Sequence, residues 1–364
     1  MNKILQTISE KSPHLSWIKD NALLVVKHGS MAYGTNISTS DEDFKGVAIP
    51  PKEYFFGSLK VFEQAELKDP DTVIYDIRKF FKLSIDNNPN LIETMHVDES
   101  DIMYISNLGI ELLKHKNEFL SKRAKYSFAG YAIAQLKRIK THRKYILNPP
   151  TKCPDRKDFG LKEAPLINGD QLAAITSVIQ AELDKINFNF IDHLEEDVKF
   201  EIKHHMTSML AEFKINKDQQ WLACANKIGL DSNFIEILFK ERQFFNAKKE
   251  WDQYVNWKNT RNSARFALEE KFKYDTKHAL HLIRLLRMCK EIVQTGKVIV
   301  KRPDAQELLE IRNGLWSYDK LIEESEKLQK DIDAALPTST LPNVADKVKL
   351  DNLCISLVEK SLSK

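Results

Sequence analysis

Extended apolar runs are concentrated near the start of this 364-residue chain, and this distribution constrains the fold more than any other feature. The runs predict strands at residues 22–27, 44–49 and 72–75. Helix-like stretches lie between and around these runs. Strands mixed with helices over so short a length are typical of a small α/β unit, which we expect over roughly the first 120 residues.

The rest of the chain is predicted to be mostly helical. A long basic helix over residues 126–147 is stopped by Asn148, Pro149 and Pro150, because proline removes a backbone donor and clashes with the preceding turn. The predicted fold class is therefore α+β, with a small α/β domain over residues 1–122 and a larger helical domain over residues 123–364. Later helices are expected at 171–185, 193–213, 233–245, 251–273, 276–295, 304–312, 318–335 and 345–362.

The composition is that of an ordinary folded protein, with 42% hydrophobic and 29% charged residues. No apolar stretch approaches the roughly 18 residues that a membrane span requires. The first 15 residues lack the apolar segment of a signal peptide. The four cysteines lie far apart, without a C-x-x-C spacing or a disulfide framework. These features predict a soluble, intracellular protein with no membrane partner.

The most informative segment joins the first predicted strand to the second. It contains Gly29-Ser30 and, after ten residues, Asp41-Glu42-Asp43. Gly29 lets the backbone approach a phosphate, and the Ser30 hydroxyl with nearby N–H groups can hold phosphate oxygens where a helix begins. The carboxylates of Asp41 and Asp43 share one face of a strand and can bind Mg²⁺ together. The segment therefore predicts metal-assisted handling of a nucleotide.

At these residues the sequence resembles the DNA polymerase β-like nucleotidyltransferase superfamily, whose signature is Gly-Ser, about ten residues, and Asp-x-Asp. Further pieces resemble the stand-alone predicted nucleotidyltransferases of bacteria and their phages, the YcgL-like group. Residues 165–250 carry no recognised piece. The matching pieces lie at residues 75–80, 88–93, 130–135, 158–161 and 274–287, so they extend along most of the chain.

The resemblance implies a metal-dependent nucleotidyltransferase that moves a nucleoside monophosphate from an NTP to an acceptor hydroxyl and releases pyrophosphate. It implies a catalytic role for residues 1–122 and substrate or nucleotide binding for residues 123–364. The implied cofactor is Mg²⁺ or Mn²⁺, and two such ions would stabilise the attacking and leaving oxygens. The implied location is the cytoplasm of a bacterial cell or of a phage-infected host.

The superfamily usually adds a third carboxylate from a neighbouring strand, which binds metal and helps to deprotonate the attacking hydroxyl. Asp76, which closes the third predicted strand, is the first choice for this catalytic and metal-binding role. Asp71, which opens the same strand, and Glu93 remain alternatives. Asp76 could instead cap the helix that starts at Ile77, a common role for aspartate.

The predicted helix over residues 276–295 carries an apolar stripe, with Lys277, His281 and Arg284 on the opposite side. A charged outer face is by itself typical of a solvated helix. Together with the resemblance, this pattern leads us to expect that the face binds the nucleotide. Arg284 would bind phosphate oxygens through two N–H groups, and Lys277 would attract phosphate through its single charge. Neither His278 nor His281 is expected to bind metal, because no cysteine or third histidine has a suitable spacing.

Positive charge is concentrated in residues 121–163, which hold twelve Lys and Arg against three Asp and Glu, whereas the whole chain has a net charge of only +3. Arg138, Lys140 and Arg143, with tyrosines nearby, predict contact with an RNA acceptor such as a tRNA 3′ end. The same charge would also suit a triphosphate or a solvated surface. Alternative functions are nucleotidyl transfer to a protein or a small molecule, and nucleotide or RNA binding without turnover.

Overall fold

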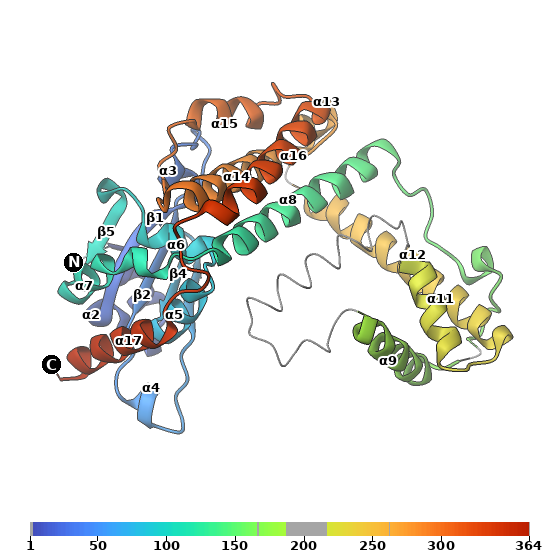
Figure 1. The fold of residues 1–364 in the computed structure, drawn as a ribbon, viewed down its shortest axis with the longest axis horizontal. Helices are drawn as coiled ribbons and strands as arrows, with labels where there is room; N and C mark the ends of the chain where they lie inside the picture. Colours follow the sequence, from blue (N-terminus) through green and yellow to red (C-terminus); the bar gives the residue numbers. More distant parts are fainter. Residues whose placement is uncertain (1–2, 166, 187–216, 262, 364) are drawn as a thin grey trace. The chain divides into compact units, whose positions relative to one another are not determined.

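The computed structural model describes residues 3–165, 167–186, 217–261 and 263–363. The chain forms two compact units (Figure 1). The first unit combines Met1–Ile146 with Ala264–Lys364, and the second comprises Leu147–Ser263. The α+β class predicted from the sequence is confirmed, because a mixed sheet near the N-terminus is followed by a mostly helical region.

A mixed sheet lies in the first unit (Figure 1). It has five strands in the order β3-β4-β2-β1-β5. The three predicted strands are confirmed as β1, β2 and β4. The two edge strands were not predicted, since β3 is largely polar and β5 is only four residues long. The strands are β1 (Ala22–His28), β2 (Asp43–Ala48), β3 (Gln64–Lys68), β4 (Asp71–Asp76) and β5 (Ile102–Ile105).

The pairing of the strands decides which polar side chains meet at each end of the sheet. β1 and β2 are antiparallel, and His28 lies opposite Asp43. β2 and β4 are parallel, with Asp43 opposite Asp71 and Ala48 opposite Asp76. Because a strand rises about 3.3 Å per residue, Asp71 and Asp76 lie roughly 16 Å apart along β4. Asp71 therefore lies at the same end of the sheet as Asp43, and Asp76 lies at the other end.

Helices cover both faces of the sheet. Val25 of β1 belongs to one apolar cluster with the N-terminal helices, whereas its neighbours Leu24 and Val26 belong to the larger cluster on the opposite face. This alternation follows from the two-residue period of a strand. The helices of the N-terminal part are α1 (Lys3–Lys11), α2 (Ile18–Asn21), α3 (Gly29–Tyr33), α4 (Glu53–Phe56), α5 (Ile77–Ile85), α6 (Pro89–Met95), α7 (Asn107–Lys114) and α8 (Arg123–Leu147).

Most of the later helices confirm the prediction, including the left-handed cap at Gly296. The two helices expected at 233–245 and 251–273 have different bounds, because α12 continues without a break to Thr260. The helix expected at 193–213 lies outside the described residues. The later helices are α9 (Gly169–Ile186), α11 (Lys217–Lys227), α12 (Ser232–Thr260), α13 (Ser263–Phe272), α14 (Thr276–Thr295), α15 (Ala305–Arg312), α16 (Tyr318–Ala335) and α17 (Lys347–Leu362). Short 3₁₀ turns occur at Pro13–Leu15, Glu99–Asp101, Lys116–Phe119, Arg156–Phe159 and Leu336–Thr338.

α14 is the central helix of the first unit and lies beside α16 (Figure 1). Twelve of its twenty residues are buried. Its apolar side chains belong to the same cluster as Val47 of the sheet and Phe128 of α8. The predicted boundary at residue 122 is therefore not a boundary between compact units, because α8 and α14 share one core with the sheet. The roles predicted for the two sides of that boundary stay predictions.

The second unit has an apolar cluster of its own, which includes Trp221, Ile235 and Leu238. An ion pair between Arg156 and Glu241 is nearly buried, with 2.5 Å between Nη2 and Oε1. It joins the 3₁₀ turn Arg156–Phe159 of this unit to α12. The bounds of the unit include the whole stretch 165–250, in which the sequence shows no recognised motif.

A buried ion pair connects α14 to α6 in the first unit. Arg284 Nη1 lies 2.6 Å from Glu93 Oε1, and both side chains are almost inaccessible to solvent. The Tyr33 hydroxyl of α3 donates to the same carboxylate at 2.5 Å. The Tyr33 ring also lies under the guanidinium, 3.8 Å from its centre. The charge of Arg284 is thus used inside the core, and the structure does not place this residue on an outer phosphate-binding face.

We predict that Glu93→Leu lowers the free energy of unfolding by about 3–5 kcal/mol, because it leaves the buried Arg284 charge without its partner. The double variant Glu93→Leu/Arg284→Met removes both charges and should lose less. Urea unfolding followed by circular dichroism measures both values. A double variant that is less stable than the single variant would contradict this account.

Candidate active site

The turn between β1 and α3 brings the backbone close to a carboxylate. Gly29 has a φ of +64°, and a Cβ atom at this position would lie 2.2 Å from Asp43 Oδ2. A side chain here would be both strained and in collision with Asp43. The sequence assigns Gly29 to phosphate approach. The structure adds a second reason for glycine at this position, because the Asp43 carboxylate occupies the space that a side chain would need.

A cavity of about 150 Å³ lies in front of this turn. It brings together six of the predicted site residues from two distant parts of the sequence. The first part supplies the Gly-Ser turn and the acid pair, and the second supplies the start of α14. The predicted residues that line the cavity are Gly29, Ser30, Asp41, Asp43, Lys277 and His281, and they are joined by Thr35, Thr39, Ser40, Leu280 and Arg312.

Three carboxylates gather at the end of the sheet beside this cavity. Partial burial raises the pKa of Asp43, and the negative charges of Asp71 and then Asp41 raise it further, while Lys277 acts in the opposite direction. Carboxylates that repel one another in this way favour a shared cation. Oxygen ligands are those that Mg²⁺ and Mn²⁺ prefer. The donor set and the space at Gly29 therefore fit the metal that the resemblance implies.

Asp76, the first choice for the third carboxylate, lies at the far end of β4 from Asp43. Its Oδ1 accepts a hydrogen bond from the Arg78 amide at 2.7 Å and caps α5. Its Oδ2 lies 2.7 Å from Arg78 Nη2. The structure thus gives Asp76 the capping role that the sequence offered as its alternative. Glu93, the other alternative, is bound to Arg284. Asp71 is the candidate that lies beside Asp43.

Positive charge lines the opposite side of the cavity. Burial lowers the pKa of His281 well below its ordinary value, and the charges of Arg284, Lys277, His278 and Arg312 lower it further. The neutral form of the His281 imidazole is therefore favoured. The surrounding positive potential favours a bound anion such as a phosphate.

Sequence reasoning missed two charged residues, Arg312, which lines the cavity, and Lys45, whose charge acts on Asp43. Lys45 lies on β2 two residues after Asp43, and burial lowers its pKa to about 8. Its Nζ donates to Asn90 Oδ1 at 2.7 Å. The alternation of side chains along a strand could have indicated Lys45. Arg312, whose Nη1 donates to the Thr35 carbonyl at 3.3 Å, carries no local signal, because it reaches the cavity only through the tertiary fold.

The three residues predicted to contact an acceptor differ in their surroundings on α8. Arg138 and Lys140 are exposed. Arg143 is half-buried, donates to the Lys273 carbonyl at 3.1 Å and stacks 4.1 Å above the centre of the Tyr318 ring. Arg143 therefore connects elements of the first unit, and only the other two present their charge outward. In the described part of the chain, no helix combines the length and apolarity needed to cross a membrane.

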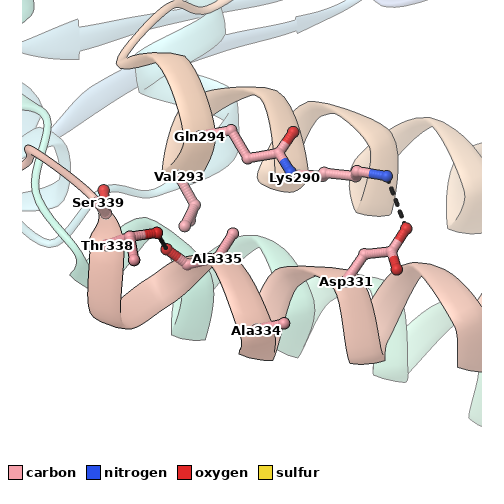
Figure 2. A pocket seen from close by; sticks show the side chains of 8 residues that line it. All are labelled: Lys290, Val293, Gln294, Asp331, Ala334, Ala335, Thr338 and Ser339. Atoms are coloured by element: carbon pink, nitrogen blue, oxygen red, sulfur yellow. Dashed lines mark hydrogen bonds and ion pairs between the residues drawn. The ribbon is translucent and has the colours of Figure 1, made fainter.

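A larger hollow of about 540 Å³ lies between α14 and α16 (Figure 2). An ion pair between Lys290 and Asp331, with 2.6 Å between Nζ and Oδ2, lies at its edge. It contains none of the predicted site residues, so its volume alone does not identify it as an active site. Its lining consists of Lys290, Val293, Gln294, Asp331, Ala334, Ala335, Thr338 and Ser339.

The mixed sheet, the glycine turn and the carboxylates at one sheet end are consistent with the resemblance to polymerase β-like nucleotidyltransferases. Residues 1–148 match the family model described as "RNA repair pathway DNA polymerase beta family". This match confirms the resemblance predicted from the sequence. The matched part ends before α14, so Lys277, His281 and Arg312 lie outside it.

A second comparison extends over nearly the whole chain. It is 21% identical over 338 residues to an uncharacterized 38.9 kDa protein from the nrdC-mobD intergenic region of Enterobacteria phage T4. The aligned part covers 88% of this chain and 91% of the phage protein. The likeness therefore includes both the sheet and the later helices, and it supports the predicted association with phages.

We predict that Asp43→Asn stabilises the protein near neutral pH in metal-free buffer. The raised pKa of Asp43 means that ionisation of this carboxyl is disfavoured in the folded state, so its charge costs stability above that pKa. The gain should shrink as the pH falls through the raised pKa, because wild-type Asp43 is then protonated.

Thermal unfolding in EDTA between pH 4 and pH 8 measures this difference. Asp76→Asn is the matched control, and it should destabilise the protein because it weakens the α5 cap and the contact with Arg78. A loss of stability for Asp43→Asn at neutral pH would contradict the proposed crowding of carboxylates.

Proposed function

We propose that this protein is a metal-dependent nucleotidyltransferase that moves a nucleoside monophosphate from an NTP to a hydroxyl of an RNA. One observation carries the proposal. A single cavity has the Gly29-Ser30 turn and the acid pair on one side, and Lys277 with Arg312 on the other. A triphosphate bound with divalent cations needs both carboxylates for the cations and positive charge for its free oxygens.

In this proposal Asp41, Asp43 and Asp71 hold the Mg²⁺ or Mn²⁺ ions. When bound, the metal stabilises the charge that develops on the transferred phosphoryl group and on the attacking and leaving oxygens. Asp71 replaces Asp76 as the third carboxylate, because strand pairing puts Asp71 directly beside Asp43.

The side chains of the cavity then have separate tasks. Ser30 and the N–H groups at the start of α3 hold the triphosphate, and Lys277 and Arg312 neutralise its outer phosphates. Asp71 accepts the proton of the acceptor hydroxyl. The acceptor oxygen forms a bond to the α-phosphorus, the bond from that phosphorus to the bridging oxygen breaks, and pyrophosphate leaves.

RNA is the proposed acceptor for two reasons. The family description of the matched region refers to an RNA repair pathway. In addition, α8 presents Arg138 and Lys140 to solvent, and exposed cations attract the RNA backbone. The most direct test incubates the protein with each α-labelled NTP, Mg²⁺ or Mn²⁺, and total cellular RNA and protein. Label in RNA supports the proposal, whereas label confined to protein or to small molecules identifies one of the alternative acceptors.

The assignment of the third carboxylate predicts opposite outcomes for two aspartates on one strand. Asp71→Asn should reduce transfer by a factor of about 10²–10⁴, the contribution typical of a general base. Asp76→Asn should keep most of the transfer when assayed below its unfolding temperature. Release of labelled pyrophosphate measures both rates. If Asp76→Asn lost transfer and Asp71→Asn kept it, Asp76 would be the third carboxylate and this assignment would be wrong.

The proposed acceptor surface predicts that RNA and NTP binding can be separated. The double variant Arg138→Glu/Lys140→Glu should bind RNA more weakly and with a smaller salt dependence, because fewer counterions are released from the backbone. Its affinity for a non-hydrolysable NTP should match that of wild type. Fluorescence anisotropy with RNA across salt concentrations and calorimetry with the NTP provide the two measurements. Unchanged RNA affinity would mean that α8 presents only a solvated face.

A further inference from the structure

Two histidines and one aspartate from separate elements converge at the N-terminus of α14. His142 belongs to α8, Asp275 caps α14, and His278 lies in the first turn of α14. One ligand atom from each of the three lies within 4.8 Å of the other two. The sequence predicted that His278 binds no metal, because no partner ligand has a suitable spacing, and 133 positions separate His142 from Asp275.

The two distances from Asp275 to the imidazoles suit a tetrahedral metal ion. Asp275 Oδ2 lies 3.2 Å from His142 Nδ1 and 3.5 Å from His278 Nε2. Zinc binds imidazole nitrogen and carboxylate oxygen at roughly 2.0–2.2 Å, so two ligand atoms of a tetrahedral site lie roughly 3.3–3.5 Å apart. Both imidazoles are partly exposed, with 19% and 17% of their side-chain surface accessible, which leaves a path for a water molecule as fourth ligand.

The neighbouring contacts orient each ligand as a metal site requires. Gln135 Oε1 lies 2.7 Å from His278 Nδ1, so the Nδ1–H donates to the amide and Nε2 keeps its lone pair. Such an outer hydrogen bond is the usual way in which a metal-binding histidine is held. Asp275 uses Oδ1 to accept from the His278 amide at 3.0 Å, which leaves Oδ2 directed at the two imidazoles.

A further contact holds Asp275 in place. The buried Glu269 carboxyl group forms a hydrogen bond with Asp275, so the position of this ligand is fixed from a third side.

We propose that His142, Asp275 and His278 form a structural binding site for one Zn²⁺ ion that fastens α8 to the start of α14. Imidazole ligands and tetrahedral spacing distinguish this site from the oxygen-lined cavity, which suits Mg²⁺ or Mn²⁺. The bound ion would fix the turn of α14 that carries Lys277 and lies immediately before His281.

The wild-type protein provides the first test. Full-length protein is stripped with EDTA, dialysed, and titrated with Zn²⁺ in competition with a chromophoric indicator. We expect one tight equivalent per chain and a rise in the thermal unfolding temperature. Titration with Co²⁺ should give the visible absorption of a four-coordinate ion. Absence of a tight zinc equivalent, or a weak six-coordinate Co²⁺ spectrum, would overturn the proposal.

Variants assign the equivalent to these residues. His142→Gln should lose it, and Gln135→Ala, which removes only the outer hydrogen bond, should weaken zinc binding by roughly 10–100-fold. His115→Gln is the control, because His115 is a partly exposed histidine paired with Glu118 outside the cluster. Tight zinc binding that survives in His142→Gln would overturn the proposal. If that variant does not fold, Gln135→Ala and the wild-type Co²⁺ spectrum decide.

A last variant separates this site from the proposed catalytic metals. Asp41→Asn/Asp43→Asn should keep the zinc equivalent, whatever its effect on nucleotidyl transfer. Loss of the equivalent in this variant would show that zinc binds the catalytic carboxylates, and the assignment to His142, Asp275 and His278 would be wrong. Failure of the transfer assay with an intact zinc equivalent would contradict only the proposed function.

Discussion

The buried pair between Arg284 and Glu93 is the interaction on which the cavity depends. It joins α14 to α6, and Tyr33 of α3 completes it from the side of the Gly-Ser turn. Because Lys277 and His281 lie one to two turns before Arg284 on a rigid helix, this contact sets their distance from Ser30. The sequence predicted that Arg284 binds the substrate. In the structure, Arg284 instead aligns α14 with the Gly-Ser turn, the two sides of the cavity that would hold the substrate.

Parallel pairing of β2 with β4 is the second constraint, because it selects the carboxylates that act together. The register places Asp43 beside Asp71 and leaves Asp76 at the opposite sheet end. Asp76 is then available to cap α5, and Asp71 adds its charge to a site that already contains two aspartates. Partial burial and then this crowding raise the pKa of Asp43. Such stored repulsion favours metal binding over an empty site.

The sequence predicted the local features well and the tertiary ones poorly. The strand before Gly29 and the bounds of α14 follow from short-range patterns, and the structure confirms both elements. The acid pair lines the cavity, but β2 begins only at Asp43, so Asp41 precedes the strand on which both were expected. Asp71 lies beside Asp43 and Asp76 lies at the other sheet end because β2 and β4 are parallel. The residues of a single strand do not show in which direction it pairs. The helical periodicity of α14 predicts that Arg284 faces outward. Arg284 is nevertheless buried, because it forms an ion pair with Glu93 and packs on the Tyr33 ring. Arg312 lines the cavity and His142 contacts Asp275, but each lies far in sequence from the other residues of its site. No short sequence pattern therefore indicates either residue.

A crystal structure with Mn²⁺ and a non-hydrolysable NTP tests the central claim most directly, because anomalous scattering locates each ion. The account predicts manganese peaks bounded by Asp41, Asp43 and Asp71, with the phosphates reaching Ser30, Lys277 and Arg312. Nucleotide bound in the hollow between α14 and α16, or manganese at Asp76 and none beside Asp43, would contradict it.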